Sequence, residues 1–217
     1  RVLTTRIAWL LSMSKVNSQE ILAVTFTNKA AREMLLRIGS MLPYNLRGMW
    51  VGTFHGLCNR MLRHHHEQAA LPESFQILDM QDQLSSIKRL MKNLNVNTDK
   101  IVPRQVQKFI NSAKDEGLRP ENIDDPNGFK REFIGLYDAY DSQCQKEGVV
   151  DFGELLLRSL ELLRRSESIR KHYQTRFKHI LVDEFQDTNS LQYSWLKLLS
   201  CQSTNVLAVG DDDQSIY

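Results

Sequence analysis

Residues 180–187 read Ile-Leu-Val-Asp-Glu-Phe-Gln-Asp, an apolar run that ends in two adjacent carboxylates, Asp183 and Glu184. Such a run predicts a buried strand of a parallel α/β sheet, in which ligands collect beyond the carboxyl ends of the strands. One acid at that edge could hold a magnesium ion while the other orients a water molecule, as hydrolysis of a nucleoside triphosphate requires. Acids also follow strands simply to cap the next helix, so this stretch alone leaves both interpretations open.

A second apolar strand is predicted over residues 206–209, ahead of a glycine and the polar run Asp-Asp-Asp-Gln-Ser. A helical stretch over about 190–199 separates the two runs, so together they predict a βαβ unit with two buried parallel strands. Both loops would open on one edge, where Asp183, Glu184 and Gln214 could meet around one ligand. The polar run could also be a solvated turn, but the coincidence of two such loops favours a site.

Composition sets modest limits on the class of protein. The chain has 217 residues, of which 41% are hydrophobic and 25% charged, as in an ordinary globular protein with one large domain or two small ones. No apolar run approaches the ~20 residues of a membrane helix, and no signal-peptide pattern opens the chain. Its three cysteines lie far apart, which favours neither a zinc site nor a disulfide framework and fits a reducing cytoplasm.

Charge is unevenly distributed along the chain, although the net charge is only +2. Residues 1–70 hold nine Lys and Arg against three Asp and Glu, whereas residues 181–217 hold one against six. The first segment could therefore face a polyanion, and the last suits a cation such as magnesium. A pI near 8.4 permits nucleic-acid binding without establishing it.

Hydrophobic periodicity divides the chain into three segments. Residues 1–70 and 178–217 alternate strands with helices, whereas strand signals largely vanish over 71–177. The simplest architecture is an α/β parallel-sheet domain that carries a large all-helical insertion. Strands are predicted over 21–26 and 49–53, and helices over 7–12, 30–42, 56–66, 79–94, 103–115, 128–147, 152–165 and 168–177.

Two strand-end loops in the first segment point to a nucleic-acid strand. In one, Thr27 or Asn28 can cap the following helix, whose first amides form an anion site together with Lys29. Phe26 could offer a flat face to a base there. In the loop Gly-Thr-Phe-His-Gly at 52–56, a threonine and a histidine could donate to backbone phosphates. Packing in the core is the competing interpretation for the phenylalanine of each loop.

Four motifs together resemble, in order, motifs Ia, Ib, II and III of superfamily 1 DNA helicases of the UvrD/Rep/PcrA family, with its UvrD branch nearest. They are Thr-Phe-Thr-Asn-Lys-Ala-Ala at 25–31, Gly-Thr-Phe-His-Gly at 52–56, Val-Asp-Glu-Phe-Gln-Asp at 182–187 and Gly-Asp-Asp-Asp-Gln-Ser-Ile-Tyr at 210–217. Connecting segments at 115–120 and 150–155 agree, so the resemblance spans essentially the whole chain.

The resemblance implies a partial RecA-like (P-loop NTPase) parallel-sheet domain with a large all-helical insertion. Residues 1–70 would be the first part of subdomain 1A, 71–177 the insertion called 1B, and 178–217 the second part of 1A. ATP and Mg²⁺ would be the cofactors, and movement along DNA would run 3′ to 5′. Single-stranded DNA and single/double-strand junctions would be the partners, together with repair proteins, in the bacterial cytoplasm at the nucleoid and without a membrane.

The resemblance also assigns roles to individual residues. Asp183 would bind magnesium and the nucleotide, and Glu184 would orient and deprotonate the attacking water. Gln214 would contact the γ-phosphate, and Arg1 would lie at the nucleotide because an arginine follows the phosphate-binding loop in the family. The DNA track would comprise Phe26, Thr27, Asn28, Lys29, Thr53, His55 and Tyr217.

One departure from the family pattern limits what the chain is expected to do alone. No Gly-x-x-x-x-Gly-Lys-Ser/Thr occurs in it, so the sequence is interpreted as an internal fragment without the Walker A loop and the second RecA-like lobe. Residues 1–217 alone are expected to be inactive. Two alternatives are a non-catalytic module that binds single-stranded DNA or a partner, and the motor of a helicase–nuclease, although no nuclease motif is visible.

Overall fold

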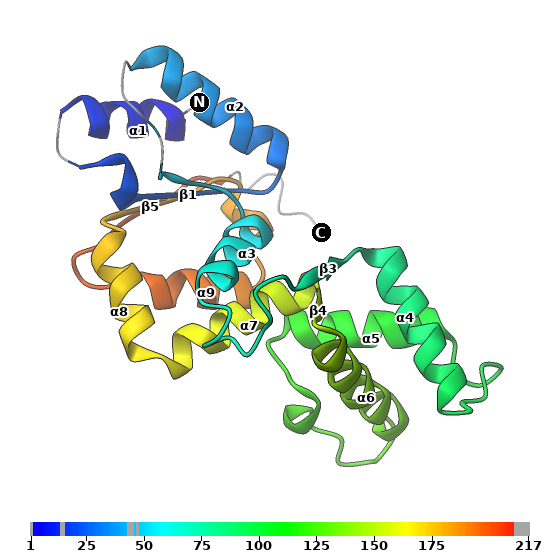
Figure 1. Cartoon of the computed structure of the whole chain (residues 1–217). Helices are drawn as coiled ribbons and strands as arrows, with labels where there is room; N and C mark the ends of the chain where they lie inside the picture. Colours follow the sequence, from blue (N-terminus) through cyan, green and yellow to red (C-terminus); the bar gives the residue numbers. More distant parts are fainter. Residues whose placement is uncertain (1, 14–15, 43–45, 47, 211–217) are drawn as a thin grey trace. The chain divides into compact units, whose positions relative to one another are not determined.

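The chain forms two compact units. The structure, a computed structural model, describes residues 2–13, 16–42, 46 and 48–210 (Figure 1). Unit 1 comprises Arg1–Met61 and Leu160–Tyr217, and unit 2 comprises Leu62–Ser159. Within the described ranges, no helix has both the length and the apolar character needed to cross a membrane.

Unit 1 is built on a four-stranded parallel sheet with the order β2-β1-β5-β6. Its central strands, β1 (Ile21–Thr25) and β5 (His179–Val182), are almost wholly buried, as continuous apolar runs predict for a parallel sheet. β2 (Trp50–Thr53) and β6 (Asn205–Ala208) flank them. The predicted α/β class with a parallel sheet is therefore confirmed.

Helices cover both faces of this sheet. On one face, α1 (Val2–Ser12) and α2 (Asn28–Met41) enclose a core with Ile21, Ala23 and Leu181 of the strands (Figure 1). On the other face lie α8 (Glu167–Arg176), α9 (Ser190–Leu199) and α3 (Phe54–His64). Most of α3 belongs to unit 1, and its last residues belong to unit 2. Trp50 of β2 makes edge-to-face contacts with Tyr173 and Phe177, both at 5.4 Å between ring centroids.

The expectation that the strand over 206–209 is buried was wrong. β6 is mostly exposed, and the side chain of Val206 is 56% accessible. Among the described strands only β5 pairs with β6, so β6 lies at the edge of the sheet. An apolar run therefore identified the strand correctly but did not determine its place in the sheet.

The sequence predicted an all-helical insertion, but unit 2, although mainly helical, also contains two short strands. Its α-helices are the last residues of α3, the helices α4 (Met80–Asn93), α5 (Pro103–Asp115) and α6 (Arg131–Glu147), and the first part of α7 (Phe152–Arg165). β3 (Gln76–Leu78) and β4 (Val149–Asp151) add a two-stranded parallel sheet. Strands of three residues are too short to produce a visible alternation, and the left-handed Gly148 (φ 65°) turns the chain from α6 into β4.

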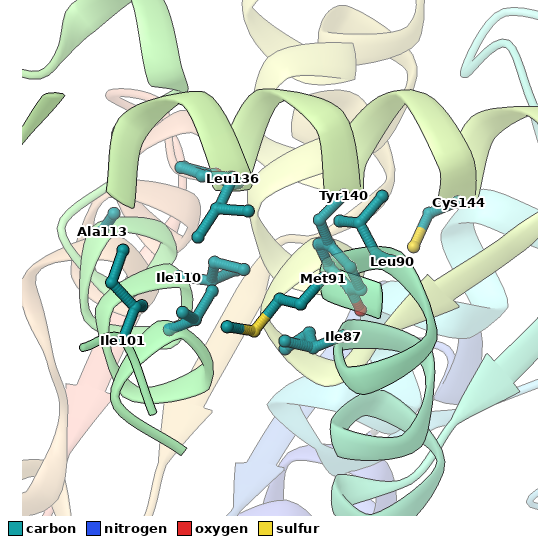
Figure 2. Close-up of a cluster of buried hydrophobic side chains, with 11 residues drawn as sticks. Ile87, Leu90, Met91, Ile101, Ile110, Ala113, Leu136, Tyr140 and Cys144 are labelled. Atoms are coloured by element: carbon teal, nitrogen blue, oxygen red, sulfur yellow. The ribbon is translucent and has the colours of Figure 1, made fainter. Parts of the chain in front are cut away.

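The apolar core of unit 2 lies between α4, α5 and α6. Figure 2 shows side chains of these helices meeting, among them Ile87, Met91, Ile110 and Tyr140, each fully buried. The two units divide within α3 and α7, whereas the sequence-based division into 1–70, 71–177 and 178–217 follows the motif pattern. The sequence-based division stays a prediction. Periodicity shows that a helix such as α8 is amphipathic, but it does not show which hydrophobic core the helix joins.

A buried lysine organises a second part of unit 2. The Nζ atom of Lys114 lies 3.1 Å from Asp141, 3.0 Å from Asp151 and 3.0 Å from Glu154, and its side chain is 1% exposed. Burial opposes the charge on Lys114, but the three carboxylates outweigh it and raise the pKa of the amine well above its ordinary value. Tyr140 also donates to Asp151, with 2.9 Å between the oxygens.

Two arginines complete this cluster. Arg119 contacts Asp141 at 2.8 Å and Glu154 at 2.9 Å, and Arg158 contacts Glu154 at 2.7 Å. Burial would raise the pKa of Glu154, but Lys114, Arg119 and Arg158 hold it well below the ordinary value. Three cations thus balance three carboxylates, which we call the charge cluster: Lys114, Arg119, Asp141, Asp151, Glu154 and Arg158.

Removing the cation at the centre of the charge cluster should destabilise unit 2. We expect Lys114→Met to lower the free energy of unfolding of unit 2 by about 3–5 kcal/mol, because buried carboxylates lose their partner. Lys108→Met, at an exposed position of α5, should change it by less than about 0.5 kcal/mol. Hydrogen exchange of the α5 and α6 amides under increasing urea measures both, and equal protection in the two variants would contradict the expectation.

The contribution of Glu154 should depend on pH in one direction. Because its pKa is lowered in the folded state, its stabilisation is present above the ordinary value of 4.5 and is lost as pH falls. We therefore expect the stability difference between the wild type and Glu154→Gln to shrink when hydrogen exchange is compared at neutral and acidic pH. A difference that grows on acidification would show that Glu154 is not held ionised.

Candidate functional site

The loops that carry the predicted motifs leave the sheet at one edge. In register, Thr25 lies beside Thr53, Val24 beside Val182, and Val182 beside Ala208. Because all four strands are parallel, the residues that follow them emerge on the same side. The strand order puts the two loops with predicted DNA contacts after β2 and β1, and the acidic loop after β5.

Asp183 continues β5 by one residue. Its backbone N–H donates to the carbonyl of Val24 at 3.0 Å, and its side chain is half-buried. Burial and the neighbouring Glu184 raise the pKa of the Asp183 carboxyl above its ordinary value. A cation at this carboxylate would relieve both effects.

The residues at this edge fit a magnesium ion that is held jointly with a nucleotide. Over the part of the chain that the structure describes, no three His, Cys, Asp or Glu side chains gather as a metal site. Magnesium does not need such a cage, because it usually takes one or two carboxylates and completes its shell with substrate phosphates and water. Asp183 offers one such carboxylate at the expected edge.

Glu184 occupies an unusual backbone conformation. Its φ and ψ angles are 50° and 47°, in the left-handed region that a residue other than glycine rarely adopts. Such conformations cost about 1–3 kcal/mol and gather at functional sites. The chain then enters a short 3₁₀ helix, Phe185–Asp187, and the side chain of Glu184 is exposed.

Sequence reasoning missed two residues beside Glu184. The Nε2 atom of Gln186 donates to Oε2 of Glu184 at 2.7 Å. Gly210 lies against the same amide, since a Cβ atom at that position would be 2.6 Å from Oε1 of Gln186. The sequence offered only a glutamine two residues beyond the predicted base and a glycine shortly after the next apolar run, without indicating that the two are in contact.

Three predicted site residues lie outside the described residues. They are Arg1, Gln214 and Tyr217. Their roles at the nucleotide, the γ-phosphate and the DNA, and the meeting of Gln214 with the two acids, stay predictions.

The loop after β1 has the capping geometry that the sequence predicts. Oγ1 of Thr27 accepts from the N–H of Ala30 at 3.1 Å, so Thr27 is the residue that caps α2. The helix begins at Asn28, two residues earlier than predicted, and both Asn28 and Lys29 are exposed in its first turn. Free N–H groups of a first helical turn beside a lysine form an anion site.

The loop after β2 repeats this arrangement. Oγ1 of Thr53 accepts from the N–H of Gly56 at 3.2 Å, and α3 begins at Phe54 instead of the predicted Gly56. Thr53 and His55 are half-buried. A threonine thus caps the helix that follows each of these two neighbouring strands: Thr27, two residues after the end of β1, and Thr53, the last residue of β2.

The two phenylalanines of these loops have different environments. Phe54 is 2% exposed and contacts the edge of Trp195 at 6.2 Å between ring centroids, so the core interpretation holds for it. Phe26 lies 5.8 Å from Phe54 and remains half-buried. Contact of Phe26 with a base therefore stays a prediction.

Comparison with known proteins agrees with this geometry. Residues 1–217 match the family model described as the UvrD/REP helicase N-terminal domain. The chain is 53% identical over 218 residues to DNA helicase II of Escherichia coli (strain K12), and the matched region covers 100% of the chain and 30% of that protein. It is 40% identical over 219 residues to ATP-dependent DNA helicase PcrA of Bacillus subtilis (strain 168), again covering 100% of the chain and 30% of the relative.

The chain thus spans about 30% of the length of these curated relatives. A family model that covers every residue, together with strands, acidic loop and capped loops in the order of the family's motifs, leads to one conclusion. The chain belongs to the UvrD/REP helicase N-terminal domain family.

Proposed function

We propose that this chain is part of the motor of an ATP-dependent DNA helicase that couples ATP hydrolysis to movement along single-stranded DNA. One observation carries the proposal: an acidic loop and two threonine-capped loops leave adjacent parallel strands at the same sheet edge. The helicase names of the relatives support it. Because the chain spans about 30% of those relatives, the activity belongs to the longer protein.

The chemistry at β5 divides between the two acids. Asp183 would hold Mg²⁺ with its half-buried carboxylate, and the bound ion would neutralise charge on the phosphates of ATP. Glu184 would orient the attacking water and take its proton at the exposed carboxylate. Arg1 would lie at the nucleotide, and Gln214 would contact the γ-phosphate.

The loops after β1 and β2 would hold the DNA strand. Amides of the first turns of α2 and α3 can donate to phosphate oxygens, and Lys29 adds a positive charge. These groups carry no base specificity, as a translocating protein requires. The proposed contact residues are Phe26, Thr27, Asn28, Lys29, Thr53, His55 and Tyr217.

Finer parts of the proposal rest on family resemblance. They are 3′-to-5′ movement, action in DNA repair at single/double-strand junctions with repair proteins, and work at the nucleoid in the bacterial cytoplasm. The division into subdomain 1A (1–70 and 178–217) and insertion 1B (71–177) belongs with them. Residues 1–217 contain no Gly-x-x-x-x-Gly-Lys-Ser/Thr, so we expect no ATP turnover from these residues alone.

Replacement of the proposed base tests the catalytic assignment. In the full-length protein that contains this chain, Glu184→Gln should lower kcat for DNA-stimulated ATP hydrolysis by about a hundredfold or more, because water loses its proton acceptor. Glu167→Gln is the matched control, since that exposed residue of α8 forms an ion pair with Lys171 at 2.7 Å on the same helix. Activity retained in Glu184→Gln would remove the assignment.

Salt dependence tests the DNA interface. If Lys29 contacts one phosphate, Lys29→Ala should reduce the slope of log affinity against log salt concentration for single-stranded DNA by about 0.7. Arg37→Ala is the control on the same helix, because Arg37 pairs with Glu33 at 3.4 Å. Fluorescence anisotropy over a salt series measures both slopes, and identical slopes in Lys29→Ala and the wild type would exclude the contact.

A further inference from the structure

We infer that Gln186 is a positioning residue, whose side-chain amide holds the Glu184 carboxylate in the orientation that hydrolysis needs and links it to the chain at Gly210. The inference rests on the proposed function, since it takes Glu184 as the group that activates water. It extends that function to a residue between the acidic loop and the end of β6.

The hydrogen bond itself is the first line of argument. Nε2 of Gln186 donates to Oε2 of Glu184 at 2.7 Å, a short distance typical of bonds to an ionised acceptor. The backbone of Glu184 lies in the left-handed region, but this conformation does not by itself fix the rotamer of its exposed side chain. One charge-assisted bond therefore selects an orientation that the backbone alone leaves open.

The surroundings of Gly210 give the second line of argument. A Cβ atom at Gly210 would lie 2.6 Å from Oε1 of Gln186 and 3.4 Å from its backbone nitrogen. The N–H of Phe185 donates to the carbonyl of Val209 at 2.9 Å, which fastens the turn after Glu184 to the chain just beyond β6. A side chain at this position would therefore require the amide of Gln186 to move from its present place.

These contacts join two loops through a single side chain. The amide has one end on the Glu184 carboxylate and the other against Gly210. A displacement of the chain at Gly210 would therefore reach the carboxylate through Gln186. We expect Gln186 to act on the rate of the chemical step and not on the affinity for ATP, because it contacts the proposed base.

Two substitutions of Gln186 in the full-length protein test this role. Gln186→Ala removes the amide, and Gln186→Glu preserves its length while replacing the donor by a like charge. Both should lower kcat for DNA-stimulated ATP hydrolysis by about 10–100-fold, as loss of an orienting partner does, with KM for ATP within about threefold. If Gln186 only filled space in the turn, the Glu variant would keep its activity. Gln202→Ala, in the exposed turn before β6, is the matched control.

Gly210→Ala provides an independent test, because its methyl group would displace the amide of Gln186. The single variant should lower kcat, and the double variant Gln186→Ala/Gly210→Ala should lose little beyond Gln186→Ala, since both changes break the same contact. Full additivity of the two losses would overturn the link to Gly210. Thermal unfolding of each variant checks folding, and if Gly210→Ala does not fold, the two Gln186 variants decide.

Glu184→Gln, assayed in parallel, separates this inference from the proposed function. If Glu184→Gln abolishes turnover while both Gln186 variants keep kcat within about twofold of the wild type, the positioning role alone is overturned. A raised KM with unchanged kcat in the Gln186 variants overturns it as well. If Glu184→Gln remains active, the catalytic assignment and the positioning role fail together.

Discussion

The hydrogen-bonded ladder between β1 and β5 is the constraint on which the rest of the structure depends. It pairs Ile21 with His179 and continues to Val24 beside Val182, so it joins segments from opposite ends of the chain. Both strands are buried, and an unpaired backbone group there would cost the free energy of a lost hydrogen bond. A slip by one residue would turn every side chain to the other face and shift Asp183 relative to the loops that follow β1 and β2.

Much of this frame could be predicted from local sequence, and the exceptions share a cause. Continuous apolar runs identified β1 and β5, and of the two predicted candidates, Thr27 and Asn28, Thr27 caps α2. The exposure of β6 was not predictable, because local periodicity does not say which elements pack alongside a given strand. β3 and β4 were not predicted, because each strand has only three residues, which is too few to show an alternating pattern.

The candidate site follows the same division between local and tertiary information. The positions of the two acids follow from the strand that carries them, since ligands collect at the carboxyl edge of a parallel sheet. The role of Gln186 depends on the left-handed Glu184 and on contact with Gly210, 24 positions along the chain, and neither is encoded locally. Phe26 and Phe54 illustrate the point again, because each follows a strand, yet Phe54 is buried against Trp195 whereas Phe26 is half-buried.

The charge cluster and the acidic loop use carboxylates in opposite ways, and the pKa directions distinguish them. Glu154 is fully buried, yet three cations hold its pKa low, so its charge is satisfied within unit 2. Asp183 is half-buried, and burial together with the like charge of Glu184 raises its pKa. A cation from outside the protein would favour the ionised form of a carboxylate whose pKa is raised in this way, and magnesium bound with a nucleotide would supply such a cation.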